Sequence, residues 1–454
     1  MSKDPRGFGA VHGGLVSAPE NHLCDADFKN LVFSRRNLMG LAVSSTLLPA
    51  ALSATEAQQD VERTAAVVDR SPPAYGLGHS VAKRPYGLPS QHQHGLERRS
   101  LKGLSPVPQN SASFTPLQGL FGIITPSGLH YERHHSGWID PDPRSHRLMI
   151  SGSHPSLIQT PMIFSLYDLM RLPAVSRIHF LECSGNTGTE RLRAVAPTVQ
   201  YTHGLLSCSE FTGVPLRLLL ERCGVDFTKA RYVLAEGADA AALTRTIPME
   251  LIENDEVLVA YGQNGEHLRP ENGFPLRLVV PGVQGVSWVK WLRRIEVGEV
   301  PYNTRDEALK YIDLMPDGMH RQYTSTQEVK SVILSPSGGQ TLTQRGFHAV
   351  TGVAWSGRGR IRGVDVSIDG GRNWRAAQLT GPALDKCLTR FHCDWVWDGG
   401  EAILQSRAID ETGHVQPTYA ALRAARGTGS VYHNNAIQSW GIETSGEVRN
   451  VQVA

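Results

Sequence analysis

The chain has 454 residues, of which 40% are hydrophobic and 19% are charged, and this ordinary globular composition excludes wholesale disorder. Lys and Arg (45) nearly balance Asp and Glu (43), so the chain lacks the basic excess that is typical of nucleic-acid binders. Its six cysteines form no C-x-x-C or C-x-x-C-H motif, which excludes the common zinc ribbons and an attached c-type haem.

The N-terminus carries a pattern typical of an export signal. Arg35-Arg36 precedes residues 37–54, which hold no charge but include Gly, Ser, Thr and Pro. This length is compatible with a membrane span, yet the segment is only mildly apolar. A twin arginine before such a segment is typical of the twin-arginine route. The sequence therefore predicts an export signal over residues 1–57, cleaved within residues 50–58, and a periplasmic protein without a membrane span; a buried helix is the alternative.

Export by this route bears on the chemistry. The twin-arginine route carries proteins that are already folded, often because a cofactor is inserted in the cytoplasm, so a periplasmic enzyme with a bulky cofactor is the first class to consider. Folding in reducing surroundings makes disulfides less expected. The pairs Cys208/Cys223 and Cys387/Cys393 could oxidise after export, but all four are predicted to be buried thiols.

Two domains are predicted after a polar arm. Residues 58–115 are polar, rich in proline and without a periodic apolar pattern, which predicts an extended arm on the surface. Over residues 116–325 short apolar runs alternate with short helical patterns, which indicates an α+β domain. Strands are predicted at 146–150, 176–181, 230–235, 256–260 and 276–280, and helices at 165–171 and 215–223.

Residues 326–454 have mostly strand patterns. Val364 and Val366 alternate with polar residues, the run 369–371 (DGG) supplies a turn, and Trp374 begins a return strand. Roughly seven short strands of this kind predict an immunoglobulin-like β-sandwich. Further strands are predicted at 347–355, 391–397 and 402–409.

Cys183 is a candidate metal ligand. A predicted buried strand over residues 178–181 ends just before it, and a tight polar turn over residues 184–186 (SGN) follows. A cysteine at a strand end, before a loop with free backbone N–H groups, is well placed to exist as a thiolate. A thiolate suits a soft or high-valent metal. Taken alone, Cys183 fits a buried structural cysteine better than a metal ligand, so the motifs around it must be considered before a role is assigned.

Five motifs, in order, resemble those of the sulfite oxidase family of molybdenum enzymes. They correspond to the family's R-N-H, C-A-G-N, D-H-G-F-P-V-R and P-G-V-x-G-x-x-x-V-K-W-L motifs and to its dimerisation domain. The resemblance covers about residues 116–454. The motifs here are RHH at 133–135, ECSGN at 182–186, ENGFPLR at 271–277, PGVQGVSWVKWL at 281–292, and the sandwich segments 352–357 and 364–371.

The resemblance implies a fold and a cofactor. It implies an α+β molybdopterin-binding domain over residues 116–325, followed by an immunoglobulin-like dimerisation domain over residues 326–454. It also implies a molybdenum–molybdopterin cofactor whose metal is bound by Cys183. The cofactor's phosphate needs fixed cationic donors, which Arg277 and Lys290 supply. The residues implied to contact the cofactor are Arg133, His134, His135, Ser184, Asp239, Asn272, Arg277, Trp288, Val289 and Lys290.

The same resemblance implies catalytic roles for three residues. Arg133 and Arg426 match the family's two pocket arginines through R-x-H and A-R-G, and would bind negative sulfur–oxygen groups. A structural ion pair is the alternative role for either arginine. The family's sulfite oxidases place a catalytic tyrosine directly after R-D, but Glu307 stands at that position here. Tyr311 is the nearest replacement, and this departure argues against free sulfite as the substrate.

Within the family, the export signal, the ECSGN motif and residues 302–318 look most like the sulfane dehydrogenases of the Sox sulfur-oxidation system. This resemblance implies oxidation of a sulfane sulfur held on a carrier protein's cysteine, and electron transfer to a c-type cytochrome subunit. It also implies a homodimer formed through the C-terminal domain. The alternatives are a periplasmic sulfite dehydrogenase acting on free sulfite, and a non-catalytic binding protein with a degenerate cofactor domain.

Overall fold

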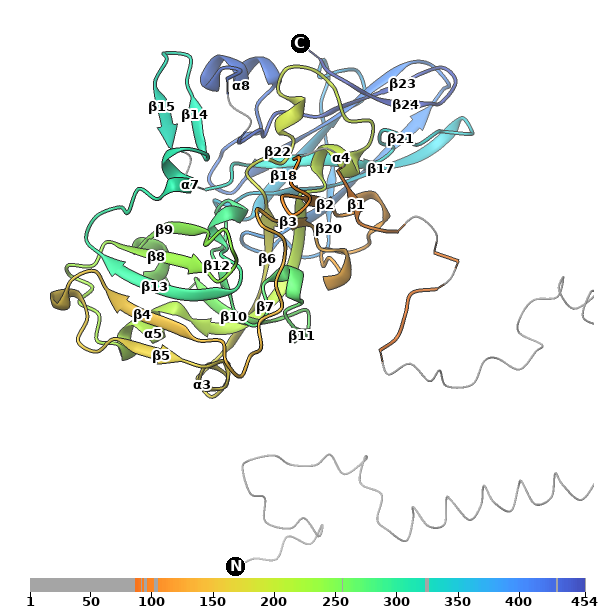
Figure 1. Cartoon of the computed structure of the whole chain (residues 1–454). Coiled ribbons are helices and arrows are strands. Elements are labelled where there is room, and N and C mark those ends of the chain that lie inside the picture. The colour runs from red at the N-terminus through yellow and green to blue at the C-terminus, as the bar shows by residue number, and fades with distance from the viewer. Residues whose placement is uncertain are drawn as a thin grey trace, which may run out of the picture. The chain divides into compact units, whose positions relative to one another are not determined.

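Alternating apolar and polar residues give this protein short strands rather than long helices. The computed structural model describes residues 86–453 except positions 91, 94–95, 102–104, 255, 323–325 and 430–431, and the predicted export signal lies outside them. From Ser90 onward the chain forms one compact unit with two β-rich halves (Figure 1). None of the described helices is long and apolar enough to cross a bilayer.

The N-terminal half packs two sheets around one core. The first has the strand order β5-β4-β13-β8-β9, in which β4 and β13 are parallel. The second has the order β11-β10-β7-β6, with β12 beside β10. Leu148, Phe211 and Leu258 lie fully buried between them. The strands are β4 (Leu148–Gly152), β5 (Met162–Phe164), β6 (Val175–Glu182), β7 (Leu206–Pro215), β8 (Tyr232–Gly237), β9 (Thr244–Pro248), β10 (Leu258–Gln263), β11 (Glu266–His267), β12 (Arg277–Val279) and β13 (Leu292–Gly298).

Short helices connect the strands. Ser165 begins α3 with a capping box: its hydroxyl accepts from the Asp168 N–H, and the Asp168 carboxylate accepts from the Ser165 N–H. The helix α5 follows β7 directly and buries Leu216 and Leu219 on one face. Both helices were predicted. The helices are α3 (Leu166–Met170), α4 (Val199–His203), α5 (Leu216–Arg222), α6 (Glu250–Glu253), α7 (Arg305–Ala308) and α8 (Tyr419–Arg426).

The C-terminal half is the predicted β-sandwich. One sheet has the order β16-β17-β21-β20, and the other β19-β18-β22-β23-β24. The predicted turn at 369–371 is present, because the Ser367 hydroxyl accepts from the Gly371 N–H (2.8 Å) and Gly370 has φ +73°. The strands are β16 (Lys330–Ser335), β17 (Gly346–Trp355), β18 (Ile361–Ser367), β19 (Arg375–Ala376), β20 (Gln378–Thr380), β21 (Thr389–Trp397), β22 (Ala402–Asp410), β23 (Ser439–Ile442) and β24 (Val448–Val451).

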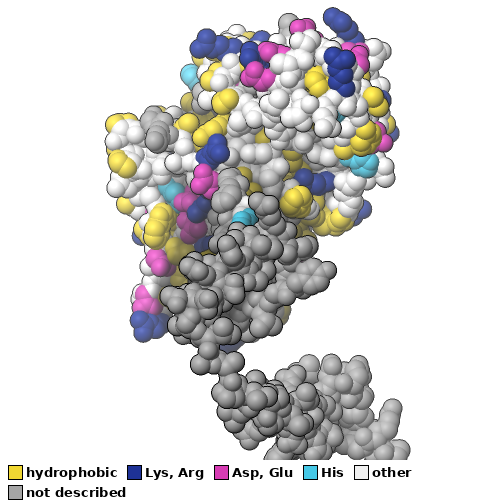
Figure 2. Space-filling view, turned by 90° about the vertical axis from the view of Figure 1, so that its right-hand side faces the viewer, with side chains coloured by type: hydrophobic (Ala, Val, Ile, Leu, Met, Phe, Trp, Pro, Cys, Tyr) yellow, Lys and Arg dark blue, Asp and Glu magenta, His cyan; other side chains and the backbone are white. Residues whose placement is uncertain are grey.

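A small hairpin stands between the two halves in the sequence. It pairs β14 (Ile312–Leu314) with β15 (His320–Gln322) and projects from the body near α8 (Figure 1). On the face shown in Figure 2, basic and acidic side chains are interspersed, in keeping with the balanced charge of the sequence. The predicted domain boundary near residue 326 stays a prediction, and the first sandwich strand begins at Lys330.

The N-terminal half contributes residues to the hydrophobic core of the sandwich. Phe180 and Leu206, from β6 and β7, belong to the core cluster of the sandwich. Cys208 of β7 also belongs to it, and its sulfur lies 3.5 Å from that of Cys387 in the sandwich. Both are buried free thiols, so the structure brings Cys208 to Cys387 rather than to Cys223. The halves are therefore continuous through their apolar interior.

The end of the predicted surface arm differs from the prediction. The end of the arm contributes β1 (Arg99–Ser100) and β2 (Ala112–Phe114); β2 lies between β1 and β3 (Glu132–Arg133) and pairs with both in one small sheet. Ala112 and Phe114 are buried in the core of the N-terminal half. A three-residue strand is too short to show a periodic apolar pattern, so the sequence offered no signal for it.

The packing of Phe180 in the sandwich core predicts a stability effect. Phe180→Ala should cost about 3–5 kcal/mol, because it empties a buried site between the halves. We expect a melting temperature several degrees lower by differential scanning calorimetry. Phe121→Ala is the matched control, because Phe121 is 89% exposed whereas Phe180 is 1% exposed. Equal melting temperatures for the two variants would contradict this packing.

Candidate functional site

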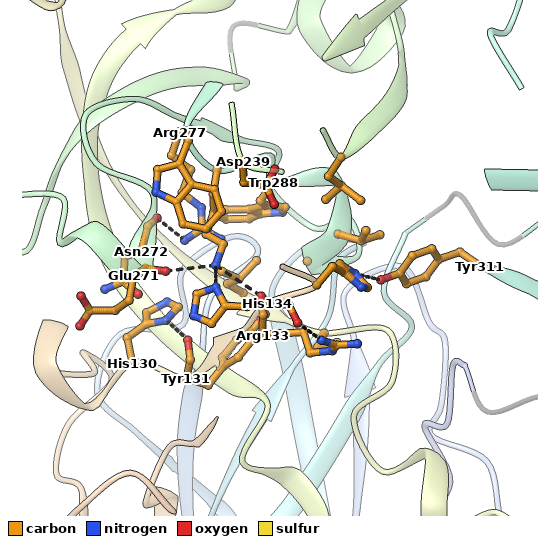
Figure 3. A pocket seen from close by; sticks show the side chains of 18 residues that line it. His130, Tyr131, Arg133, His134, Asp239, Glu271, Asn272, Arg277, Trp288 and Tyr311 are labelled. Carbon is orange, nitrogen blue, oxygen red and sulfur yellow. Dashed lines mark hydrogen bonds between the residues drawn. The ribbon is translucent and has the colours of Figure 1, made fainter. Parts of the chain in front are cut away.

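One pocket collects side chains from segments far apart in the sequence (Figure 3). The segment after β3, the end of β6, the loop after β8, the turn before β12 and the segment before β13 all contribute to its lining. Tyr311 reaches it from the side opposite Glu271 and Asn272. The predicted site residues in the lining are Arg133, His134, His135, Cys183, Asp239, Asn272, Arg277, Trp288, Lys290 and Tyr311.

Lys290 lies at the centre of a hydrogen-bonded group. Its ammonium donates to His134 Nδ1 (2.8 Å) and to the Glu271 carbonyl (3.1 Å). His134 Nε2 therefore carries a proton and donates to the Glu132 carboxylate (2.8 Å). The ammonium also lies 4.6 Å from the centroid of the Trp291 ring. Burial lowers the pKa of Lys290 well below its ordinary value, so this cation is stabilised poorly by the protein alone.

Arg277 is the second cation of the pocket, and it is buried. Its Nη1 donates to the Asn272 carbonyl (3.0 Å), but its buried Nε has no hydrogen-bond partner among the described residues. Burial lowers the pKa of Arg277 to about 10. Gly273, at φ +111°, lets the turn approach Lys290, because a Cβ there would lie 3.0 Å from the Lys290 Cβ. A buried donor without a partner indicates that this part of the pocket accommodates an anion.

Asp239 and Trp288 complete the wall. Asp239 accepts a hydrogen bond from the Ser136 hydroxyl (2.8 Å), which ties the loop after β8 to the segment after β3. The indole N–H of Trp288 donates to the Val283 carbonyl (3.1 Å). Trp288 therefore lines the pocket with its ring and has no free donor to direct into it.

Cys183 lies just after β6, partly exposed toward the pocket. The backbone around it is fixed, because its N–H donates to the Leu205 carbonyl (3.0 Å) and its carbonyl accepts from the Asn186 N–H (2.9 Å). Burial raises the pKa of the Cys183 thiol, and the Gly185 N–H and Arg133 offset this only in part. Without a metal the residue is therefore a thiol, whereas the sequence pattern predicted a thiolate. A bound metal cation would displace the proton.

Tyr311 meets the residues after β3 inside the pocket. Its hydroxyl oxygen lies 3.0 Å from His135 Nε2, and its ring lies 4.9 Å from that of Tyr432. Burial, with Arg133 nearby, lowers the pKa of His135 to about 3, so this imidazole is neutral at ordinary pH. The Arg245 guanidinium lies 5.4 Å from the centroid of the Tyr311 ring. The pocket thus presents a tyrosine hydroxyl beside a neutral histidine.

Glu307, which stands where the family has a tyrosine, does not line this pocket. Its carboxylate accepts from the Thr246 N–H (2.8 Å) and hydroxyl (2.9 Å), which fixes α7 against β9. It also lies 3.7 Å from the buried Arg245 guanidinium. At the position where the family has a tyrosine, this chain therefore has a structural carboxylate, and the tyrosine that lines the pocket is Tyr311.

Three predicted site residues lie outside the pocket. Val289 is buried in the core, and its carbonyl accepts from the Leu278 N–H (2.8 Å). Ser184 lies behind Cys183, and its buried hydroxyl has no partner among the described residues. The structure does not bring Arg426 to the pocket, because its guanidinium pairs with the buried Asp313 carboxylate (3.2 Å) at the end of α8.

A wide cleft of about 830 Å³ opens onto the same point. It shares Arg133, His135, Cys183 and Tyr311 with the pocket. Part of its wall comes from β2 and from Ser100, Leu101 and Asn110 of the predicted arm. The arm therefore lines the approach to Cys183, a role that its polar, proline-rich sequence did not indicate.

Sequence reasoning also missed pocket residues beside the motifs. His130 and Tyr131 precede the RHH motif. Glu271 is the first residue of ENGFPLR, and Trp291 lies within PGVQGVSWVKWL. Proximity to a motif was the only available signal for them. Among the described residues, no three His, Cys, Asp or Glu side chains form a metal site.

Comparisons with known proteins identify the family. Residues 135–305 match the oxidoreductase molybdopterin binding domain, and residues 321–440 match the Mo-co oxidoreductase dimerisation domain. Sulfite oxidase of Gallus gallus is 33% identical over 326 residues, which cover 66% of this chain and 69% of that protein. The chain belongs to the sulfite oxidase family.

Other members of the family refine the comparison. A chain in the crystal structure of the sulfane dehydrogenase SoxCD from Paracoccus pantotrophus has a TM-score of 0.82 and 46% identity, covering 86% of this chain and 99% of that chain. NADH nitrate reductase of Solanum lycopersicum is 30% identical over 65% of this chain, which spans only 36% of that relative's length. The predicted α+β domain and sandwich dimerisation domain are confirmed.

The protein is therefore a molybdenum-cofactor oxidoreductase of the sulfite oxidase family. Its pocket fits the cofactor, because it brings the buried Arg277 and the half-buried Lys290 together as two cations, and the buried Arg277 Nε needs an acceptor. Molybdopterin brings a phosphate and sulfur ligands for molybdenum, which supply what the side chains around Cys183 lack.

The buried histidine of the pocket predicts a pH dependence. Burial, with Arg277 nearby, lowers the pKa of His130 to about 3, below its unfolded value. The unfolded chain therefore binds more protons below pH 6.5, and stability is lost as the pH falls. Between pH 7 and 5 the cofactor-free protein should lose about 2 kcal/mol through this residue. Urea unfolding of His130→Gln should show a correspondingly weaker pH dependence, and the exposed His320→Gln should behave as the wild type. Equal pH dependence in both variants would contradict a neutral buried His130.

Proposed function

We propose that this enzyme oxidises a sulfane sulfur carried on a cysteine of a partner protein, and passes the electrons to a c-type cytochrome. The observation that carries the proposal is the cleft of about 830 Å³ that leads to Cys183. A sulfur atom on a peptide arm needs a mouth wide enough for backbone and side chains, whereas a free oxyanion does not. The 46% identity with the SoxCD sulfane dehydrogenase chain supports the same substrate class.

The pocket residues have distinct proposed roles. Cys183 would bind the metal, and Arg277 and Lys290 would bind the cofactor phosphate. His134, His135, Ser184, Asp239, Asn272, Trp288 and Val289 would shape the cofactor site around them. The cofactor, when bound, supplies the two-electron oxidation.

Arg133 and Tyr311 would act on the substrate at the junction of pocket and cleft. Each oxidation step adds one oxygen from water to the sulfur and releases two protons and two electrons. Negative charge builds up on the oxygens that are added to the sulfur, and Arg133 is placed to stabilise that charge. Asn110, from the arm, accepts a hydrogen bond from Arg133 Nη1 (2.8 Å) and orients the guanidinium.

Oxidation of free sulfite is the second candidate. The observation that favours it is the Tyr311 hydroxyl beside His135, because a tyrosine in this place can hold a small oxyanion. The sulfite oxidase of Gallus gallus is also a relative at 33% identity. A non-catalytic binding protein is the remaining alternative, and near-zero molybdenum in protein made with functional cofactor synthesis would favour it.

The setting of the enzyme is part of the proposal. Electrons would leave to a separate cytochrome chain, because the sequence holds no C-x-x-C-H motif. The matched dimerisation domain supports a homodimer through the C-terminal half. The twin arginine supports folded export to the periplasm.

A substrate comparison tests the reaction. The rate of cytochrome reduction would be measured with sulfane-loaded carrier protein and with free sulfite at equal concentration. We expect the loaded carrier to react roughly tenfold faster or more, since about 1.4 kcal/mol of contact in the cleft is enough for that ratio. Cys183→Ser should abolish both rates, because a hydroxyl is a poor ligand for this metal. A faster rate with sulfite would transfer the proposal to sulfite oxidation.

Export provides a separate test. Replacing Arg35 and Arg36 with lysine keeps the charge but removes the twin-arginine signal. We expect the double variant to accumulate in the cytoplasm as folded, molybdenum-loaded protein, as measured by cell fractionation. A single-lysine variant is the matched control for partial loss. Normal periplasmic yield of the double variant would overturn the proposed location.

A further inference from the structure

A buried ion pair joins the sandwich to the strand that carries the metal ligand. Lys330, the first residue of β16, donates from Nζ to Glu182 Oε1 (2.9 Å), and Glu182 is the last residue of β6. The exposed fraction is 2% for Lys330 and 3% for Glu182. Cys183 follows Glu182 directly. A charged group supplied by the sandwich thus lies immediately behind the pocket.

Glu182 is held by hydrogen bonds on both carboxylate oxygens. Its Oε2 accepts from the Trp355 indole N–H (2.8 Å), and its Oε1 also accepts from Asn186 Nδ2 (2.9 Å). Lys330 in turn donates to the Thr187 hydroxyl (2.9 Å). Glu182, Asn186 and Thr187 flank Cys183 on both sides, so the pair fixes both ends of the loop that carries it.

The C-terminal segment after α8 holds the same loop from the other side. The His433 N–H donates to the Ser184 carbonyl (2.8 Å). The Asn434 amide donates to the Thr187 carbonyl (2.8 Å), and the Asn434 carbonyl accepts from the Thr187 hydroxyl (2.8 Å). The residues just after Cys183 are therefore ordered by groups that belong to the C-terminal half.

The charge of this pair also bears on the metal. A carboxylate adjacent in sequence to a metal-binding thiolate would add negative charge near the metal, and in a poorly solvated interior that charge is felt strongly. Lys330 cancels it at 2.9 Å. A buried ion pair of this kind contributes little net free energy to folding, because desolvation of the two charges offsets their attraction. Its role would therefore be to position the loop and to set the local charge.

We propose that Lys330, acting through Glu182, positions Cys183 and sets the charge behind it, so that the sandwich is part of the molybdenum site as well as a dimerisation domain. Lys330 and Glu182 are positioning residues, since neither lines the pocket. This inference depends on the cofactor and not on which sulfur compound is the substrate.

The midpoint potential of the molybdenum in the holoenzyme tests the proposal. EPR-monitored redox titration at one fixed pH would compare Lys330→Met, Lys330→Arg and the double variant Glu182→Gln/Lys330→Met. Lys330→Met should lower the potential, because uncompensated negative charge favours the oxidised metal. Lys330→Arg and the neutral double variant should lie close to the wild type. If Lys330→Met fails to fold or to load metal, Glu182→Gln provides the test instead. It leaves the positive charge of Lys330 uncompensated and should raise the midpoint potential.

Lys386→Met is the matched control. Lys386 of the sandwich pairs with Glu256 of the N-terminal half, so this variant also breaks an ion pair between the halves, but one that does not touch residues 182–187. Its potential should equal that of the wild type. Metal-loaded Lys330→Met and Glu182→Gln enzymes with unchanged potentials, or shifts of the same sign, would overturn the proposal. The proposal would also be overturned if the midpoint potential of the double variant differed from that of the wild type by as much as the potential of either single variant does.

Discussion

Positive charge buried around one pocket is the constraint on which the site depends. Arg277 is buried and Lys290 is half-buried, and desolvation depresses the pKa of both. Desolvating two cations in one pocket is costly unless an anion joins them. They come from the turn before β12 and the segment before β13, so the pocket forms only when the sheets of the N-terminal half are assembled. Fold and the proposed cofactor binding are therefore linked, since a cofactor phosphate would complete an arrangement that the chain leaves short of negative charge.

Strand β6 connects that pocket to the sandwich by simple alternation. Side chains on a strand point alternately to opposite faces. Leu181 accordingly packs in the core of the N-terminal half, whereas Phe180 packs in the core of the sandwich. The strand then ends beside Cys183, between the two cores. Cys183, the proposed metal ligand, is therefore held by contacts from both halves, and the loop at 183–187 is contacted by residues of the sandwich half.

Local patterns predicted local structure well, and long-range pairs escaped them. The capping box at Ser165 and the turn at 369–371 each depend on residues close together in the sequence, and both are present. The ordered family motifs likewise led to most of the pocket. By contrast, Glu182 and Lys330 lie 148 positions apart, and no local pattern records that they meet. The same holds for β2, whose three residues gain their place from pairing with β3 rather than from periodicity.

Arg426 shows how a motif can indicate a region without fixing which contact the side chain makes. The A-R-G pattern assigned it to the substrate pocket, yet its guanidinium pairs with Asp313, a buried carboxylate in β14. Burial raises the pKa of Asp313, and Arg426 opposes that effect, so the arginine favours the ionised carboxylate. Tyr311 lies two residues before Asp313 and does line the pocket. Arg426 therefore bears on the pocket through the segment that it anchors: by holding Asp313 it fixes the start of the β14–β15 hairpin, and with it the position from which the Tyr311 hydroxyl reaches His135.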